Sequence, residues 1–115
     1  MSGSVSYHSG LAAEESVAHH YTQTGHEIAA RRWRSKAGEI DLIARKDGNV
    51  VFVEVKKSKT HDRAAESLGA KQMARIYDSA ALFLEDEPNG QNTDARFDVA
   101  LVDANGVISI LENAF

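Results

Sequence analysis

An Asp-Gly pair at residues 47 and 48 constrains the fold most, because it separates two long strand-like runs. Asp-Gly between such runs is a strong signal for a two-residue type I′ hairpin, since both turn positions need a positive φ. If these two residues form the loop, the numbers of facing residues add up to 95, as those of the turn residues do. This register places Asp41 directly opposite Glu54.

The same register gathers charged side chains on one face of the hairpin. Glu39 falls opposite Lys56, and residues two apart share a face, so both are expected beside Asp41 and Glu54. The neighbours on the other face are apolar and are expected to be core: Ile40, Leu42, Val53 and Val55. Glu54 also interrupts an apolar run and shares its face with Phe52, which argues against a simply solvated face.

Two carboxylates directly opposite each other repel, and something has to offset that repulsion. A divalent cation, Mg²⁺ or Mn²⁺, is one solution, because these ions take oxygen ligands and are commonly held by one or two carboxylates. The positive charge of Lys56, or a proton shared by Asp41 and Glu54, are the alternatives. A charged sheet face exposed to water is a further interpretation that the residues leave open.

The first predicted helix, over residues 11–24, offers another carboxylate. On a helical wheel Glu14 falls near the middle of the apolar arc that includes Val17 and Tyr21, whereas Glu15 falls at its edge. A carboxylate in the middle of a packing face is costly unless it is paired or bound to a metal. We therefore expect Glu14 to reach the hairpin site. A favourable interaction with the helix dipole is the alternative.

Hydrophobic periodicity along the chain predicts two helices and five strands. The helices are expected at 11–24, closed by Gly25, and at 66–85, ended by Pro88. The strands are expected at 26–34, 38–45, 49–57, 96–102 and 107–112, with a polar break at 58–65. The order α-β-β-β-α-β-β favours an α/β fold, a mixed sheet flanked by helices. We expect this fold to form one domain over residues 10–115, after a flexible segment at residues 1–9. Arg96 and Asp98 share a strand face and are expected to pair.

Composition narrows the function. The 115 residues include no cysteine, which excludes a thiolate zinc site and makes the cytoplasm the default location. No apolar run is long enough to cross a membrane, and the start lacks a signal-peptide pattern.

The whole chain carries a net charge of −4, but residues 31–59 hold nine basic and four acidic residues, a net charge of +5. Such a patch binds phosphates, although a solvated basic hairpin is the alternative. The expected contacts to nucleic acid are Arg32, Arg34, Lys57 and Lys59.

Asp41, followed across a hairpin by Glu54-Val55-Lys56, resembles the PD-(D/E)xK nuclease superfamily. With Arg96-Phe97-Asp98-Val99, the chain is similar over residues 10–115 to the YraN-like family of uncharacterised, endonuclease-like proteins. This resemblance implies a restriction-endonuclease-like fold related to Holliday-junction resolvases. It also implies metal binding by Asp41 and Glu54, water activation or charge stabilisation by Lys56, and an accessory acidic role for Glu14.

Two positions depart from the superfamily. Its nominal Pro-Asp is Ile40-Asp41 here, which removes no chemistry. Some branches of the superfamily place a Gln-x-x-x-Tyr motif on a later helix, but Gln72 is followed four residues later by Ile76, so no role passes to Gln72. The resulting hypothesis is a metal-dependent endonuclease that hydrolyses phosphodiester bonds of DNA, branched structures included. A non-catalytic nucleic-acid-binding module and an oligomer-forming scaffold are the alternatives. Two-fold substrates such as four-way junctions would favour a homodimer by analogy.

Overall fold

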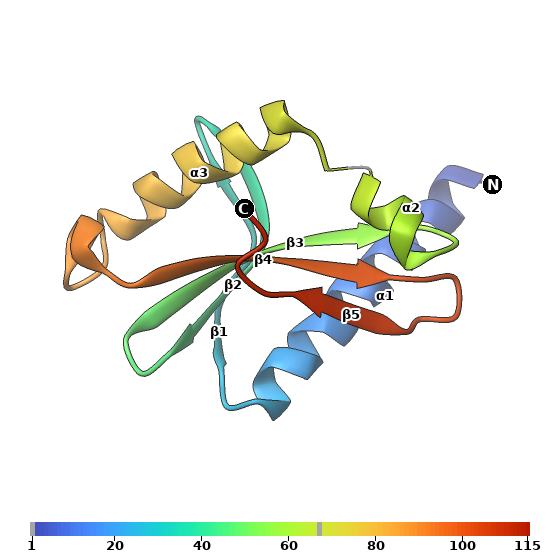
Figure 1. The fold of residues 1–115 in the computed structure, drawn as a ribbon, viewed down its shortest axis with the longest axis horizontal. Coiled ribbons are helices and arrows are strands. Elements are labelled where there is room, and N and C mark those ends of the chain that lie inside the picture. Colours follow the sequence, from blue (N-terminus) through green and yellow to red (C-terminus); the bar gives the residue numbers. More distant parts are fainter. Residues whose placement is uncertain (1, 67) are drawn as a thin grey trace.

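The computed structural model describes residues 2–66 and 68–115, which form a five-stranded sheet with helices on both faces (Figure 1). The elements are α1 (Ser2–Gln23), β1 (Glu27–Ser35), β2 (Gly38–Lys46), β3 (Asn49–Lys57), α2 (His61–Glu66), α3 (Ala70–Leu84), the 3-10 helix η1 (Gly90–Asn92), β4 (Ala95–Val102) and β5 (Ile108–Leu111). The strands lie in the order β1-β2-β3-β4-β5. Strands β3 and β4 run parallel, and the other neighbouring pairs run antiparallel. The predicted α/β architecture, a mixed sheet between helices, is confirmed.

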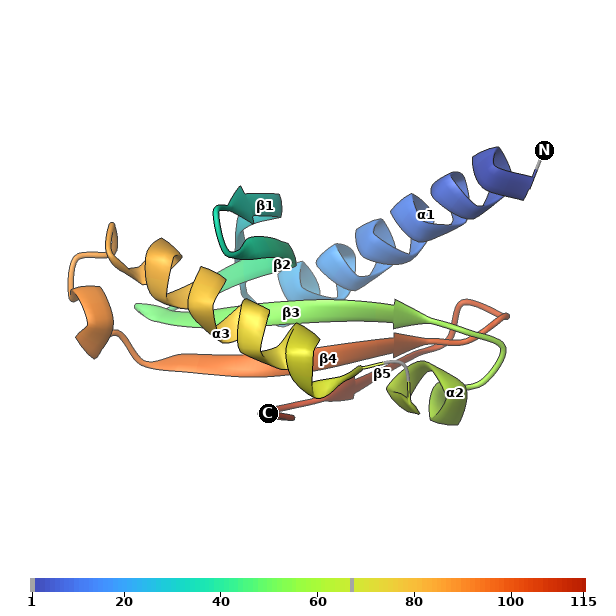
Figure 2. The same cartoon turned by 90° about the horizontal axis from the view of Figure 1, so that it is seen from above.

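The two long helices cover opposite faces of the sheet, α1 on one and α3 on the other (Figure 2). The central strand β3 sends its side chains alternately to both. Val51 and Val53 belong to the core under α1, whereas Phe52 belongs to the core under α3. Glu54 follows Phe52 at the strand period of two and so projects on the α3 side.

The hairpin between β2 and β3 forms as its turn residues predict. Asp47 has φ +54° and Gly48 has φ +81°, the positive values that a type I′ turn requires. The facing pairs run from Lys46 with Asn49 to Leu42 with Val53, in the predicted register. The expected pairing is therefore confirmed over this stretch.

Beyond Leu42 the β2–β3 ladder ends, although β2 remains paired with β1 as far as Gly38. On the other edge of β2, the residue that faces Asp41 is Arg32, which has φ +48°. A left-handed backbone is uncommon for a residue with a long side chain and is concentrated at functional sites. The structure also corrects one prediction, because Ile40 packs in the α3-side core and Leu42 in the α1-side core. Strict alternation had placed both on one face.

The helices differ from the predicted ones at three points, one of which is that the helix expected at 66–85 begins at Ala70, as α3. Helix α1 begins at Ser2 instead of Leu11, so the segment expected to be flexible is helical from Ser2 onward, and its mobility stays a prediction. The polar break expected at 58–65 contains the short helix α2. Its first turn is capped by Thr60, whose hydroxyl accepts the Arg63 N–H at 3.2 Å. The cap explains why a polar stretch forms a helix here.

Candidate active site

Asp41 and Glu54 meet at the end of the β2–β3 hairpin, in a cleft of about 320 Å³ between the sheet and α3. The cleft is lined by Gly38, Glu39, Asp41, Glu54, Gln72, Arg75 and Ile76. Glu54 is buried, with an exposed fraction of 5%. The two carboxyl groups are close enough to hydrogen-bond each other. The hairpin therefore brings together the two acids that its register predicts.

Their contact is made by side chains and not by a continued strand ladder. Asp41 Oδ2 accepts the Val55 backbone N–H at 2.9 Å. This N–H lies just beyond the last ladder pair, so the carboxylate occupies the place where a strand carbonyl would otherwise accept. The bond fixes the Asp41 side chain beside Glu54, which is the neighbour of Val55 on β3.

Burial dominates the electrostatics of this pair. Burial first, and then the negative charge of Asp41, raise the pKa of the Glu54 carboxyl to about 8, while the charge of Lys56 opposes the shift. Burial also raises the pKa of Asp41, against the stabilising hydrogen bonds from Val55 and Glu54. Without a cation, Glu54 therefore keeps its proton at neutral pH and donates it to Asp41. A shared proton was one of the offsets expected from the sequence.

Lys56 lies next to this pair and is held by Gln72 of α3. Lys56 Nζ donates to Gln72 Oε1 at 2.8 Å and lies 3.4 Å from Glu54 Oε1. The amide of Gln72 in turn donates from Nε2 to Glu54 Oε1 at 2.8 Å. The three side chains form a closed polar triangle in which Gln72 orients both Lys56 and Glu54.

Sequence reasoning missed Gln72, although a signal for it exists. Gln72 precedes Ile76 by four residues and Ser79 by seven, and both of these are buried against the sheet. A polar side chain in the middle of a buried helical face needs a partner, which is the argument that was applied to Glu14.

Glu14 approaches the site from α1, on the other side of the sheet. Its side chain is 19% exposed and its Oε2 lies 2.9 Å from Arg32 Nε, whereas Glu15 is 67% exposed and pairs with Arg31. The charge of Glu14 contributes to the raised pKa of Asp41. Of the two acids, the structure turns Glu14 towards the hairpin, as the helical wheel predicts. Its partner here is Arg32, and its part in metal binding stays a prediction.

The predicted phosphate contacts are spread around the site. Arg32 is engaged by Glu14, and Arg34 is 83% exposed with its Nε 3.9 Å from Glu39 Oε2. Lys57 and Lys59 are exposed at the end of β3 and just after it. None of these four lines the cleft that holds Asp41 and Glu54. They remain predicted contacts for a bound nucleic acid.

A divalent cation fits the chemistry of the donor set. Among the residues that the structure describes, no three Asp, Glu or His side chains gather closely enough to hold a metal by themselves. Mg²⁺ is commonly held by one or two carboxylates, with water and phosphate oxygens completing its coordination. Two adjacent carboxyl groups that must otherwise share a proton suit this role, since the cation would replace the proton. Asp41 and Glu54 are therefore the residues that would hold it.

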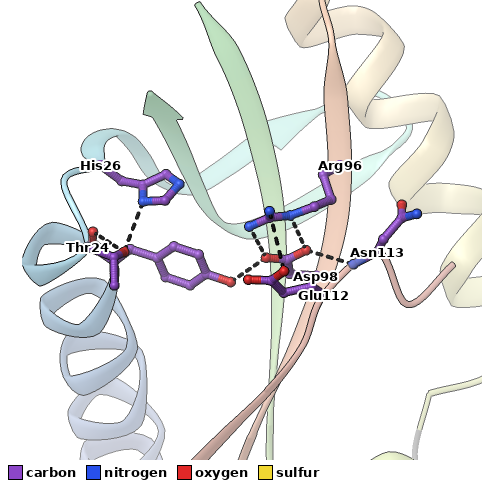
Figure 3. Close-up of polar contacts among 7 residues, drawn as sticks. Thr24, His26, Arg96, Asp98, Glu112 and Asn113 are labelled. Atoms are coloured by element: carbon purple, nitrogen blue, oxygen red, sulfur yellow. Dashed lines mark hydrogen bonds and ion pairs between the residues drawn. The ribbon is translucent and has the colours of Figure 1, made fainter. Parts of the chain in front are cut away.

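A second buried carboxylate, Asp98 on β4, has very different surroundings (Figure 3). Arg96 donates to both of its oxygens, at 2.8 and 2.9 Å, so the pairing of these two residues is confirmed. The Tyr21 hydroxyl donates at 2.7 Å and the Asn113 backbone N–H at 3.0 Å. Arg96 also lies 3.7 Å from Glu112. The network joins α1, β4 and the residues after β5.

The chain is similar in sequence to a family of known proteins. A family model described as "Uncharacterised protein family UPF0102" matches residues 13–102, a span that includes the whole cleft. A UPF0102 protein of Cereibacter sphaeroides is 59% identical over 115 residues, covering 100% of this chain and 98% of the relative. One from Ruegeria pomeroyi is 56% identical over 113 residues, covering 98% and 92%. One from Dinoroseobacter shibae is 43% identical over 105 residues, covering 91% and 78%.

Proposed function

The chain belongs to the uncharacterised protein family UPF0102, the YraN-like family, and we propose that it is a metal-dependent endonuclease acting on DNA. The observation that carries the proposal is the contact of Asp41, which is partly buried, with the buried Glu54 in one cleft, with Lys56 beside them. A charge cluster that served only the fold would pair each acid with a cation. Here two acids face each other and share one lysine, an arrangement that favours binding a cation and a phosphate.

The residues have separate roles in the proposed hydrolysis of a phosphodiester bond. Asp41 and Glu54 would hold Mg²⁺ or Mn²⁺, which when bound lowers the pKa of water and polarises a phosphoryl oxygen. Lys56 directs its ammonium group into the same place, where it would stabilise negative charge that develops on the phosphate. Gln72 holds the Lys56 and Glu54 side chains in position by its two hydrogen bonds. Glu54 has to lose its proton before it can act as a ligand, so the proposed activity should rise with pH up to about 8.

The proposal also covers the substrate, the oligomeric state and the cellular location of the protein. We propose DNA with branched structures as the substrate class, and a homodimer on substrates that have two-fold symmetry. We also propose that the protein works in the cytoplasm, in keeping with its lack of cysteine. Among the described residues, no helix is both long and apolar enough to cross a membrane. Light scattering with and without a four-way junction measures the oligomeric state.

A cleavage assay on a panel of linear and branched DNA, with Mg²⁺, with Mn²⁺ and with EDTA, tests the proposed function. The wild type should cut in the presence of a metal. Asp41→Asn, Glu54→Gln and Lys56→Met should each slow cleavage by about 100-fold or more, as expected when a group that stabilises the transition state is lost. Asp47→Asn is the matched control, because Asp47 is an exposed acid in the turn of the same hairpin. If DNA is bound but never cut with either metal, the chain is a nucleic-acid-binding module and the nuclease proposal fails.

A further inference from the structure

The basic residues around the cleft differ in whether an acid already neutralises them. On β1, each arginine has a carboxylate partner: Arg31 with Glu15, Arg32 with Glu14 and Arg34 with Glu39. Three other cations near the cleft differ from these. Among residues 2–66 and 68–115, the side chains of Lys36, Lys71 and Arg75 make no hydrogen bond or ion pair.

Arg75 connects these three cations to the candidate active site. It lines the cleft together with Asp41 and Glu54, and it is exposed to solvent. On α3 it follows Gln72 by three residues, so the two side chains leave neighbouring positions of one helix side. An exposed guanidinium group without an acidic partner, beside a cleft with two carboxyl groups, is suited to binding the phosphate that those groups would act on.

Lys36 and Lys71 continue the positive charge on both sides of Arg75. Lys71 precedes Arg75 by four residues, one helical turn, on the same exposed edge of α3. Lys36 lies in the β1–β2 turn, which is docked on α3 by a 2.9 Å hydrogen bond between Ser35 Oγ and Ser79 Oγ. Backbone and helix approach closely there, since a Cβ built on Gly38 would lie 3.6 Å from Arg75 Cβ. The three cations thus stand on two elements that are fixed to each other.

We propose that Lys36, Lys71 and Arg75 form a phosphate-binding rim over which the DNA strand enters the cleft, an inference that rests on the proposed function. Each DNA strand carries one phosphate per 3.4 Å of helix axis, so one helical turn of α3 spans neighbouring phosphates. Arg75 binds the phosphate nearest the Asp41–Glu54 pair, and the two lysines bind phosphates on either side. These contacts set the position of the strand and carry no base specificity.

Salt-dependent binding of fluorescent duplex DNA in EDTA tests the rim without any cleavage. We compare the wild type with R75Q and with the triple variant K36Q/K71Q/R75Q, and we check each fold by thermal melting, which exposed substitutions should leave unchanged. R75Q should weaken binding about fivefold to tenfold, and the triple variant about 100-fold at 0.1 M salt. The slope of log K against log salt should shrink by about 2 to 3 in the triple variant.

K46Q is the matched control, because Lys46 is an exposed lysine at the far end of β2, where its Nζ donates to the Thr24 carbonyl at 2.8 Å. Unchanged binding by K46Q together with the losses above supports the rim. Wild-type affinity and slope in the triple variant would overturn it, as would a wild type that does not bind DNA. Binding through the rim without cleavage under any metal leaves the rim standing and removes the nuclease. Cleavage by an unimpaired triple variant removes the rim and leaves the nuclease.

Discussion

Asp98 and the Asp41–Glu54 pair are two buried carboxylate clusters on opposite faces of one sheet, and they are built in opposite ways. Asp98 is 0% exposed and accepts four hydrogen bonds, two of them from the guanidinium group of Arg96 (Figure 3). Glu54 is almost as buried but has a second acid as its neighbour, with Lys56 3.4 Å away. In one cluster the acid is paired with a cation and hydrogen-bonded on both oxygens, whereas in the other two carboxyl groups lie beside a single lysine.

Under the proposed function, this difference separates a structural charge cluster from a site arranged for chemistry. A buried acid that is paired and hydrogen-bonded fixes the elements that bring its partners, here α1, β4 and the end of the chain. A buried acid that must hold a proton at neutral pH lowers stability as the pH rises, and such perturbed groups gather at functional sites. The following changes test the contrast, from the largest expected effect to the smallest.

Asp98→Asn should give the largest loss of stability, about 3–5 kcal/mol, because it removes the buried counter-charge of Arg96 and leaves only the exposed Glu112 nearby. The new amide NH₂ would also face groups that donate hydrogen bonds, including the Tyr21 hydroxyl. Urea unfolding of the variant measures the loss, with the exposed Asp47→Asn as the control. A change below about 1 kcal/mol would show that the Asp98 network is not structural.

Glu54→Gln should act in the opposite direction in metal-free buffer and stabilise the protein by about 2–4 kcal/mol at pH 8.5. The folded-state pKa of Glu54, about 8, lies above its ordinary value of 4.5. The folded protein therefore binds one more proton than the unfolded chain between these pH values. The wild type should lose this stability as the pH rises from 4.5 through 8, whereas Glu54→Gln should not.

Free energies of unfolding of the wild type and of Glu54→Gln, measured in EDTA at pH 5.5 and pH 8.5, test this prediction directly. The two proteins should be similar at the lower pH and should diverge at the higher one. Parallel pH profiles for wild type and Glu54→Gln would mean that Glu54 is ionised in the folded state. The proposed contrast with Asp98 would then be lost.

Tyr21→Phe and Gln72→Met form a matched pair, since each removes a neutral donor from one buried acid. Tyr21→Phe should cost about 1.5–3 kcal/mol, the usual value for a hydrogen bond to a charged group. Gln72→Met should cost less than about 1 kcal/mol, because protonated Glu54 carries no charge for the amide to stabilise. It should instead slow any cleavage, since Lys56 loses its anchor. Thermal melting measures the two losses of stability, and cleavage assays measure the change in rate. A larger loss of stability for Gln72→Met than for Tyr21→Phe would contradict the prediction.

Local chemistry made much of the hairpin predictable. Asp47-Gly48 specified the turn, and the turn specified the register from Lys46 to Leu42. The same reasoning failed at Ile40, because the β2–β3 ladder ends at Leu42 and the Asp41 side chain accepts the Val55 N–H beyond it. Alternation along a strand cannot anticipate where a side-chain contact replaces the strand ladder.

Whether the other site residues could be predicted depended on knowing which side of each helix faces the sheet. Glu14 could be placed because the apolar arc of its helix was read on a wheel, and the structure turns it towards Arg32 and the hairpin. Gln72 could not be placed by motif matching, since its contact with Lys56 depends on how α3 is rotated against the sheet. That rotation is set by the packing of residues such as Ile76 and Ala80 in the core.

Calorimetric titration of Mn²⁺ into the metal-free protein at pH 7.5 tests most directly the claim that Asp41 and Glu54 form a cation site. The wild type should bind one Mn²⁺ with release of about one proton, the one held by Glu54, as shown by titrations in two buffers of different ionisation enthalpy. Asp41→Asn and Glu54→Gln should lose this binding, while Lys56→Met should retain it. Equal Mn²⁺ affinity in the wild type and in both acid variants, or binding without proton release, would contradict the claim.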